Sequence, residues 1–260
     1  MAQCLVTGSS GLLGSQLVRK LEAHRHTVLR GDREGSILED VDYIFDCAAY
    51  GNLYGQDSQT KTYQANIVRF NKLLRNARKM NYKALIATSS SSVTLPVQTH
   101  YSKTKKLMEL SAMTEFYRHN KPIAAVRPYT IYGVGDNDIH LIPRIFRSCL
   151  FGEPMVFDPA PTHDYIWAED LADAYIYMAD NIQLYEGRIH PAGSGASVTN
   201  AEVMIRIEQI TGKIANITEY KNLRDYDNLN WVAPDGKWSK TSLQEGLEKI
   251  YEHYKQTAKA

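Results

Sequence analysis

Thr7-Gly8-Ser9-Ser10-Gly11-Leu12-Leu13-Gly14 is the stretch of this sequence that decides the fold. It follows a short apolar run at residues 2–7 and opens a segment in which Leu13, Leu17 and Leu21 are spaced by four. A short apolar run that stops at glycine is typical of a buried strand, and apolar side chains four residues apart form one face of a helix. The stretch therefore predicts a strand, a tight turn and a helix that reaches residue 23.

The alternation of strand and helix continues over the first 130 residues. Compact apolar runs that suit strands buried in a parallel sheet occupy residues 26–30, 43–49, 84–88 and 123–127. Helical spacing of apolar residues fills 58–79 and 102–119. The segment 31–42 is so short that a third strand near residues 36–38 leaves no room for the helix that normally follows it. The pattern predicts an α/β fold with a doubly wound parallel sheet of the Rossmann type.

The composition of the 260-residue chain excludes several classes of protein. With 30 basic and 29 acidic side chains the net charge is +1, which leaves no basic excess for nucleic acid or an anionic membrane. No apolar run approaches the roughly 18 residues of a membrane-spanning helix, and the first residues lack the pattern of a signal peptide. Cys4, Cys47 and Cys149 lack the spacing of a zinc site and are too few for a disulfide framework. We expect a cytoplasmic protein that has no metal site and binds neither nucleic acid nor membrane.

Gly8, Gly11 and Gly14 in the turn indicate a candidate ligand site as well as a sharp bend. Glycines permit a sharp turn and let backbone N–H groups approach a pyrophosphate at the positive end of the following helix. The alternative is a turn of small residues that binds no ligand. The strand before the turn and the helix after it favour a dinucleotide site.

Asp32 ends the second predicted strand, 18 residues after Gly14. A carboxylate in this place accepts hydrogen bonds from both ribose hydroxyls of NAD and repels the 2′-phosphate of NADP. Arg30 and Arg33 flank Asp32 and are able to attract that phosphate instead. The sequence therefore favours NAD as the cofactor and leaves NADP open.

The rhythm of the sequence changes after Gly133. Helices are expected at 141–150, 170–181, 200–211 and 242–255, with short strands between them. We therefore expect a dinucleotide-binding domain at residues 1–133, extended by interleaved segments around 155–190. The remainder, residues 134–260, is expected to form mainly a small, helix-rich C-terminal lobe that binds the substrate.

Tyr101 and Lys105 lie four residues apart at the start of a predicted helix, so they share one face of it. The reference pKa of a phenol is about 10, which makes it a poor acid or base at neutral pH. An ammonium group one turn away favours the phenolate, so we expect Lys105 to lower the pKa of Tyr101 toward neutrality. Ser90, at the end of the preceding strand, is placed to orient a carbonyl or an alcohol toward the phenol. Surface packing is the alternative for an isolated pair, but after a glycine turn the pair indicates proton transfer.

Further motifs follow in order along the chain. They are Ala48-Ala49, Asn66, the stretch Arg127-Pro128-Tyr129-Thr130-Ile131-Tyr132-Gly133, the stretch His163-Asp164-Tyr165-Ile166-Trp167-Ala168-Glu169-Asp170, and Thr241-Ser242-Leu243-Gln244-Glu245-Gly246-Leu247. Together with the glycine stretch, Ser90 and Tyr101-Ser102-Lys103-Thr104-Lys105, this set resembles the extended short-chain dehydrogenase/reductases. Within them it is most similar to the NAD-dependent epimerase/dehydratase family, which acts on nucleotide-sugars.

The resemblance implies a role for each matching position. Tyr101 would be the acid/base, Lys105 would bind the nicotinamide ribose and tune Tyr101, and Ser90 would take the place of the catalytic hydroxyl. The implied cofactor-binding residues are Gly8, Ser10, Gly11, Leu12, Leu13, Gly14, Asp32, Arg33, Ala48, Ala49, Asn66, Tyr101, Lys105, Pro128 and Ile131. The implied partner is a small-molecule substrate of the nucleotide-sugar class. The implied assembly is a homodimer formed through the helices at 58–79 and 102–119.

Several positions depart from the pattern of the family. The 4,6-dehydratases carry an Asp-Glu pair after the catalytic hydroxyl, where this chain has Ser91 and Ser92, so dehydration is disfavoured. His140 precedes a Leu-Ile-Pro helix start that resembles the stretch bearing the acid/base histidine of GDP-fucose synthases, and a capping role is the alternative. His163 stands where the family has an arginine that binds the substrate diphosphate. Either Arg144, Arg147 and Arg188 compensate for it, or the substrate is not a standard nucleotide-sugar. Ser91, His140, Arg144 and His163 are our candidates for substrate binding.

The sequence thus favours an NAD(P)-dependent enzyme that transfers a hydride at a sugar carbinol or ketone carbon, with C4 as the expected position. Epimerisation and reduction both stay open. The same residues are also compatible with a reductase of a non-sugar carbonyl compound, or with a cofactor-binding redox sensor without chemistry.

Overall fold

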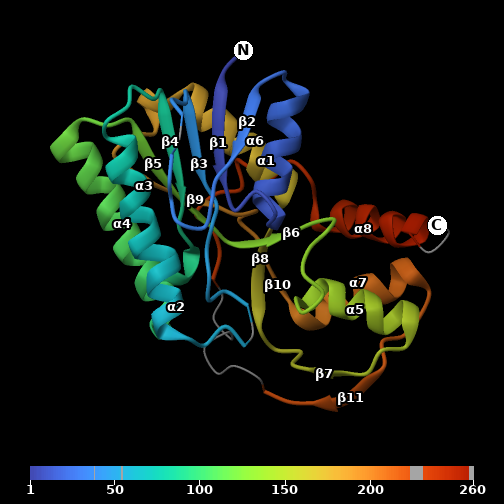
Figure 1. Cartoon of the computed structure of the whole chain (residues 1–260). Coiled ribbons are helices and arrows are strands. Elements are labelled where there is room, and N and C mark those ends of the chain that lie inside the picture. Colours follow the sequence, from blue (N-terminus) through green and yellow to red (C-terminus); the bar gives the residue numbers. More distant parts are fainter. Residues whose placement is uncertain (38, 54, 223–230, 258–260) are drawn as a thin grey trace. The chain divides into compact units, whose positions relative to one another are not determined.

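The computed structural model describes residues 1–37, 39–53, 55–222 and 231–257 (Figure 1). Its internal contacts divide the chain into two compact units. The first unit comprises Met1–Pro128 and Glu169–Ala192, and the second comprises Tyr129–Ala168 and Gly193–Ala260. The chain therefore leaves the first unit after Pro128 and returns to it for one segment. The cofactor-binding and substrate-binding roles expected for the two parts of the chain stay predictions.

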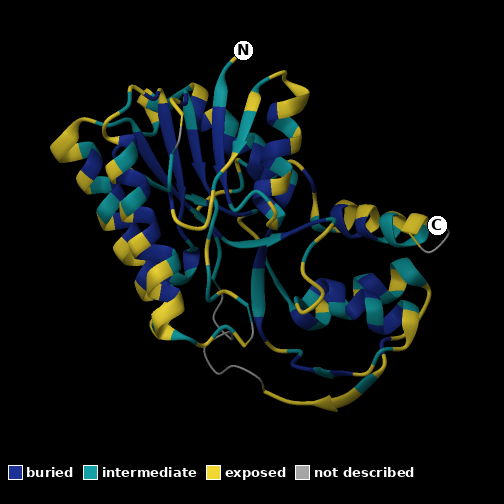
Figure 2. Cartoon of the chain, in the orientation of Figure 1, coloured by how far each residue is buried: buried dark blue, intermediate teal, exposed yellow. Residues whose placement is uncertain are grey.

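A six-stranded parallel sheet forms the centre of the first unit, in the order β2-β1-β3-β4-β5-β9. Its strands are β1 (Gln3–Thr7), β2 (Thr27–Arg30), β3 (Tyr43–Asp46), β4 (Ala84–Thr88), β5 (Ile123–Pro128) and β9 (Ile189–Ala192). Every neighbouring pair of strands runs parallel. β4 is buried along its whole length, and β2 and β9 form the edges (Figure 2). The predicted α/β fold with a doubly wound parallel sheet is confirmed.

Helices cover both faces of this sheet (Figure 1). One face carries α1 (Leu12–Ala23) and α6 (Ala168–Asp180). The other face carries α2 (Gln59–Tyr63), the π-helical turn η1 (Gln64–Val68), α3 (Arg69–Ala77) and α4 (His100–His119). Short 3-10 turns are found at η2 (Ser91–Thr94) and η3 (Ile182–Leu184).

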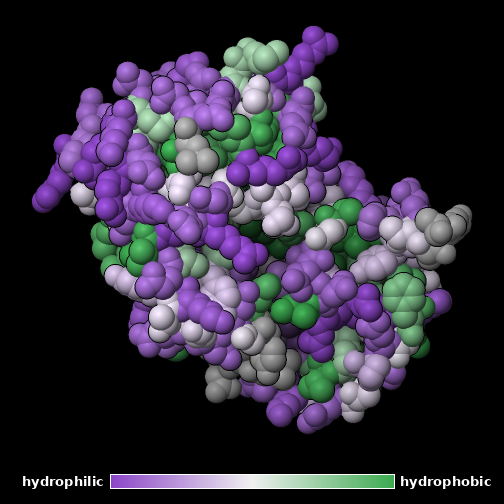
Figure 3. Space-filling model, in the orientation of Figure 1, coloured by the Kyte–Doolittle hydropathy of each residue, from purple (hydrophilic) through white to green (hydrophobic). Residues whose placement is uncertain are grey.

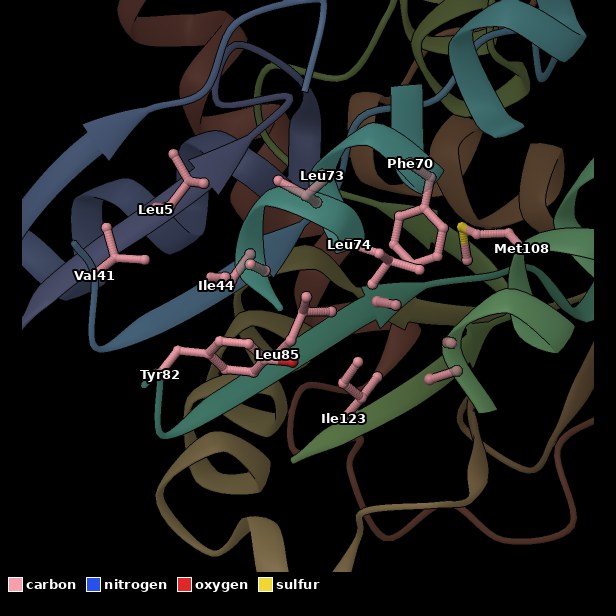
Figure 4. Packing of buried hydrophobic residues seen from close by; sticks show 14 of the residues in the cluster. Leu5, Val41, Ile44, Phe70, Leu73, Leu74, Tyr82, Leu85, Met108 and Ile123 are labelled. Carbon is pink, nitrogen blue, oxygen red and sulfur yellow. The ribbon is translucent and has the colours of Figure 1, made fainter. Parts of the chain in front are cut away.

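The apolar core of the first unit explains why these helices stay on the sheet. Leu73 and Leu74 of α3 and Met108 of α4 pack in one buried cluster with Ile44 and Leu85 of the strands (Figure 4). All five side chains have 3% or less of their surface exposed. Burial of apolar surface at about 25 cal/mol per Å² is the main stabilising contribution of such a cluster.

The second unit combines short strands with three helices in the part of the chain that the structure describes. β8 (Thr162–Trp167) lies between β10 (Ser197–Thr199), which is antiparallel to it, and β6 (Thr130–Tyr132), which is parallel. β7 (Met155–Phe157) pairs with β11 (Ile217–Tyr220), and the helices are α5 (Leu141–Phe151), α7 (Asn200–Thr211) and α8 (Leu243–Thr257). Phe146, Val203 and Leu247 belong to a core cluster that joins these helices. The prediction of a smaller, helix-rich C-terminal part is confirmed.

The link between β2 and β3 differs from the prediction. Ser36 and Ile37 are not in a strand, and Leu38 lies outside the described residues. The reason is local, because Oδ1 of Asp32 accepts the backbone N–H groups of Glu34 at 2.9 Å and Ser36 at 3.0 Å and folds the chain into a turn. The third strand predicted near residues 36–38 is therefore wrong for its first two residues.

The hydropathy of the helices and of the surface completes the description of the fold. Within the described ranges, no helix has both the length and the apolar character that a membrane crossing requires. Figure 3 shows that hydrophilic side chains dominate the face in view and that apolar ones are confined to separate patches.

Candidate active site

Gly8 and Gly14 are required by the close packing of the turn between β1 and α1, Gly8 against the chain after β3 and Gly14 against the turn itself. Gly8 has a φ of +62°, and a Cβ on it would lie 2.8 Å from the backbone N and Cα of Ala48. A Cβ on Gly14 would lie 2.1 Å from the carbonyl oxygen of Gly8. Because real Cβ atoms do not approach other atoms so closely, both positions demand glycine with or without a ligand. The first and third glycines of the turn are therefore explained by the fold itself.

Gly11 has a different position. It is exposed, and a Cβ on it would stay 3.3 Å from the carbonyl oxygen of Gly8. It is also the N-cap residue of α1, where no side chain accepts a hydrogen bond from the helix and the first turn holds no acidic residue. The N–H groups at a helix start carry a partial positive charge, so this end of α1 suits an anion such as a pyrophosphate. Leu13 is buried in the protein, whereas the neighbouring Ser10 is exposed.

Asp32 follows β2 and is exposed. Its slight burial raises its pKa, but hydrogen bonds from Ser36, Glu34 and Gly35 outweigh that effect and hold the pKa below its usual value. The carboxylate is therefore ionised at neutral pH. Arg30 is paired with Glu22 at 3.3 Å. Arg33 is exposed beside Asp32.

Asn66 joins the loop after β3 to helix α4. The side chain is fully buried inside the π-helical turn, and its Nδ2 donates to the carbonyl oxygen of Tyr50 and to Oγ1 of Thr104, each at 2.9 Å. Its Oδ1 accepts the backbone N–H of Tyr50 at 2.9 Å. Asn66 thereby fixes the chain just after Ala48, which is half-buried, and Ala49, which is exposed.

Ser90, Tyr101 and Lys105 come together at the carboxyl end of β4. Lys105 has 1% of its surface exposed, and its Nζ lies 5.8 Å from the centroid of the Tyr101 ring. The ammonium donates to the carbonyl oxygen of Thr88, the last residue of β4, at 2.7 Å. The Ser90 hydroxyl acts on Tyr101 in the direction that favours the phenolate. The structure thus assembles the three residues that the sequence singled out as catalytic.

The protonation of Tyr101 differs from our expectation. Burial raises the pKa of Tyr101 to about 12, and the Ser90 hydroxyl offsets this only in part. Burial also lowers the pKa of Lys105 to about 8, against the opposing effect of Asp46. The expectation that Lys105 brings the phenol toward neutrality is wrong for this structure, because the ammonium donates to Thr88 and the protein around the half-buried phenol disfavours the phenolate. Tyr101 therefore carries its proton at neutral pH.

The serines after Ser90 have separate partners. The Oγ of Ser90 accepts the backbone N–H of Ser92 at 3.1 Å and lies 2.9 Å from the Oγ of Ser92. Ser91 is buried, and its Oγ donates to the carbonyl oxygen of Pro128 at 2.9 Å. Ser91 thus links η2 to the end of β5.

A buried ion pair lies near the glycine turn, and our sequence predictions did not include it. Arg69 donates to both carboxylate oxygens of Asp46, at 2.7 and 2.9 Å. Thr7 donates to Asp46 at 2.6 Å and accepts the backbone N–H of Ala48 at 3.2 Å. These bonds fix the ends of β1 and β3 to each other beside Gly8. An aspartate inside the apolar run Tyr43–Asp46 is the sequence signal that indicates a buried charge with a partner.

The remaining candidates belong to the second unit. The Nδ1 of His140 lies 2.7 Å from Oδ1 of Asp136, and His140 is the N-cap residue of α5 without a side-chain capping bond. Arg144 donates to the carbonyl oxygen of Val156 at 3.3 Å. His163 is a half-buried residue of β8, and Ile131 is a half-buried residue of β6. The substrate-binding roles of the two histidines and Arg144, and the cofactor contact of Ile131, stay predictions.

Comparison with known proteins shows the family and the fold of the chain. The profile of the NAD dependent epimerase/dehydratase family matches residues 4–190, more than half of the chain. Protein CapI from Staphylococcus aureus is 25% identical over 96% of this chain and 97% of that protein. GDP-L-fucose synthase 1 from Arabidopsis thaliana is 23% identical over 97% of this chain and 93% of that protein.

Solved structures share the fold. MoeE5, solved in complex with UDP-glucose and NAD, has a TM-score of 0.88 at 22% identity and covers 98% of this chain and 99% of its own. The family profile spans the glycine turn, Ser90, Tyr101 and Lys105. The chain belongs to the NAD dependent epimerase/dehydratase family.

Proposed function

We propose that this chain is an NAD-dependent epimerase or reductase that acts at a carbinol or ketone carbon of a nucleotide-sugar, with C4 as the reacting position. The observation that carries the proposal is the convergence of Ser90, Tyr101 and Lys105 at the end of β4. The first unit also contains the glycine turn with its exposed helix start. A non-catalytic cofactor sensor does not require a phenol, a hydroxyl and an ammonium at one strand end.

The glycine turn fits a dinucleotide. Gly11 leaves the start of α1 open to a pyrophosphate, and the ionised Asp32 suits the hydroxyls of an adenosine ribose better than a 2′-phosphate. We therefore assign Gly11 and Asp32 to NAD binding, while NADP stays open because Arg33 is exposed beside Asp32. When bound, the nicotinamide accepts a hydride from a carbinol carbon and returns one to a carbonyl carbon.

Tyr101 would exchange the proton of the reacting oxygen. With a pKa of about 12 its phenol is protonated at neutral pH, so it is ready to donate to a carbonyl oxygen. Removal of a proton from a carbinol requires additional positive charge near the phenol, because a nearby cation lowers the pKa of a phenol. Ser90 would hold the same substrate oxygen by a hydrogen bond, and Lys105 would hold the nicotinamide ribose.

The nucleotide-sugar substrate is proposed from membership of the family. Ser91 and Ser92 lack the carboxylates that elimination of water needs as acid and base, which supports epimerisation or reduction over dehydration. We propose that Ser91, His140, Arg144 and His163 contribute to substrate binding. A histidine at position 163 lacks the permanent positive charge of an arginine, so the diphosphate would depend more on Arg144.

Cofactor stoichiometry distinguishes epimerase from reductase. Purified protein would be assayed with UDP-, GDP-, dTDP- and CDP-sugars, with and without added NADH or NADPH. Turnover without added cofactor, on tightly bound NAD, identifies an epimerase. Oxidation of one NAD(P)H per product identifies a reductase.

Tyr101→Phe is the decisive variant for this function. It keeps the ring and removes the proton, so activity is expected to fall on the order of 10²-fold or more. The thermal unfolding midpoint measured beside it controls for folding. Near-normal activity in Tyr101→Phe would exclude the proposed role of the phenol.

We also propose that two copies associate through α4 and the α2–α3 segment. Tyr63, Val68, Leu107 and Leu110 are large apolar side chains on these helices with 43–59% of their surface exposed. Several of them line one groove between the helices. Association of this face would remove that apolar surface from water.

A further inference from the structure

A buried carboxylate lies beside the proposed catalytic residues and has no part in the chemistry described above. Glu109 follows Lys105 by four residues and Tyr101 by eight on α4, so the three side chains share one face of the helix. The side chain of Glu109 has 4% of its surface exposed. A carboxylate buried to this degree is costly unless its oxygens are satisfied.

Two neighbouring strands satisfy this carboxylate. Arg127 of β5 donates from Nε to Oε1 at 2.7 Å and from Nη2 to Oε2 at 2.8 Å, which is a bidentate pair. The Oγ of Ser89, directly after β4, donates to the same Oε1. Glu109 therefore connects α4 to the ends of both β4 and β5.

The contact at Ser89 is next to the proposed catalytic hydroxyl. Thr88 and Ser89 are consecutive, and each is bound to α4, the first through Lys105 and the second through Glu109. Ser90 follows directly and acts on Tyr101 at the start of the same helix. The end of β4 is thus fixed to one helix at two successive residues, directly before Ser90.

We propose that Glu109 is a positioning residue, which fixes the end of β4 against α4 and supplies negative charge on the side of Lys105. Its charge and its hydrogen bonds hold Ser90, Tyr101 and Lys105 in one arrangement. The effect on turnover rests on the proposed function, whereas the effect on Lys105 does not.

The charges around Lys105 predict the direction in which its pKa changes when Glu109 is replaced. The ionisable groups that act on Lys105 are Asp46 and Cys47 at the end of β3, Arg69 of α3 and Glu109 of α4. Burial lowers the pKa of Lys105, Arg69 lowers it further, and the anionic groups raise it. In Glu109→Gln the negative charge is lost while the positive charge of Arg127 stays nearby. The pKa of Lys105 is therefore expected to fall below its wild-type value.

Glu115 provides a matched control on the same helix. Its side chain has 7% of its surface exposed, and it is held by the guanidinium of Arg78 as Glu109 is held by Arg127. It lies six residues beyond Glu109, farther from Tyr101 along α4. Glu115→Gln therefore breaks a pair whose carboxylate is similarly buried, although its arginine is 42% exposed, and it does so without touching β4. It measures the purely structural cost of such a loss.

The first experiment needs neither cofactor nor substrate. The full chain would be labelled with ¹³Cε-lysine, and Lys105 would be assigned by loss of its signal in Lys105→Arg and titrated by NMR in the wild type, Glu109→Gln and Glu115→Gln. We expect a lower titration midpoint for Lys105 in Glu109→Gln alone. Equal midpoints in the three proteins would overturn the proposal.

The second experiment uses Ser89→Ala, which removes one hydroxyl and leaves the pair of Glu109 with Arg127 intact. With the nucleotide-sugar that turns over, we expect kcat to fall about tenfold with KM and the unfolding midpoint nearly unchanged, because a misplaced hydroxyl weakens only the chemical step. Glu109→Ala should lose more, and Glu109→Asp should regain part of the activity. Wild-type kcat in Ser89→Ala would contradict the positioning role even where the proposed function holds. Absence of turnover in the wild type would contradict the proposed function and leave the NMR titration to decide the role of Glu109.

Discussion

At the scale of single residues, the site is governed by two charges that burial disfavours. Lys105 is almost fully buried and binds the carbonyl oxygen of Thr88, while Tyr101 keeps its proton because burial raises its pKa to about 12. The pKa of Lys105, about 8, lies close to neutral pH. Small changes in the surrounding charges therefore change the fraction of Lys105 that is protonated.

The depressed pKa of Lys105 predicts a pH dependence of stability. The unfolded chain holds the lysine proton up to its ordinary pKa of 10.5, whereas the folded chain releases it near 8. Between these values the unfolded state binds more protons, so this residue makes the free energy of unfolding rise with pH, by about 1 kcal/mol per pH unit at most. Urea unfolding of the wild type and Lys105→Met at pH 7, 8 and 9 measures it.

The comparison with Lys105→Met removes the contributions of other groups. Burial raises the pKa values of Cys4 and Cys47 to about 12. Above pH 9 these thiols therefore make the free energy of unfolding fall with pH, and they do so in both proteins. The stability of the wild type relative to Lys105→Met is therefore expected to increase from pH 7 to pH 9. A difference that does not vary with pH would show that Lys105 titrates normally.

At the scale of elements, the strand–turn–helix at β1 and α1 separates glycines that the fold requires from Gly11, which we propose binds the cofactor. A Cβ at position 14 meets the carbonyl oxygen of Gly8 at 2.1 Å, whereas at position 11 it stays 3.3 Å away. Gly14→Ala is therefore expected to lower the free energy of unfolding by about 3 kcal/mol or more, since overpacking against backbone has little means of relief. Gly11→Ala is expected to fold nearly as well as the wild type and to bind NADH more weakly, because its methyl group would meet the pyrophosphate in the proposed site.

Chemical denaturation and NADH fluorescence titration of both variants check this pair of expectations. Equal loss of stability in both variants would show that all the glycines serve the fold alone. Unchanged NADH affinity in Gly11→Ala would exclude the proposal that the pyrophosphate binds at the start of α1.

The sequence predicted those elements whose signal is local. β4 has the predicted bounds, Ala84–Thr88. A short, mostly apolar run between polar segments buries its side chains best as a central strand of a parallel sheet. The strand expected near Ser36 failed because the Asp32 side chain bonds to the following backbone, and residue type alone does not show that choice. The helix at 58–79 was predicted without its π-helical turn at Gln64–Val68.

The candidate site was predictable in its membership but less so in its electrostatics. Tyr101 and Lys105 were found from four-residue spacing, and the glycines from their place between strand and helix. The direction of the Lys105 ammonium depends on Thr88, and the burial of Glu109 depends on Arg127, a residue of another strand. Such partners are set by the tertiary fold, and spacing within one helix carries no information about them.

At the scale of the whole molecule, the proposed dimer gives a direct test. Leu110 of α4 has 59% of its surface exposed beside Leu107, so Leu110→Glu should place a charge in the contact and convert a dimer to a monomer. Light scattering after gel filtration measures the mass. Leu184→Glu, at a side chain 63% exposed on η3, is the matched control and should leave the dimer intact. A monomeric wild type would exclude the proposal.

The two outer strands of the parallel sheet also restrict how copies of this chain meet. β2 is a strand of four residues that ends at Arg30, and β9 contains Pro191, whose nitrogen has no hydrogen to donate. Short length, a terminal charge and a proline each discourage a foreign strand from adding to a sheet. Within the described residues, both edge strands of this sheet therefore disfavour pairing with a strand of another copy. Such edge-to-edge pairing is the first step of amyloid-type aggregation.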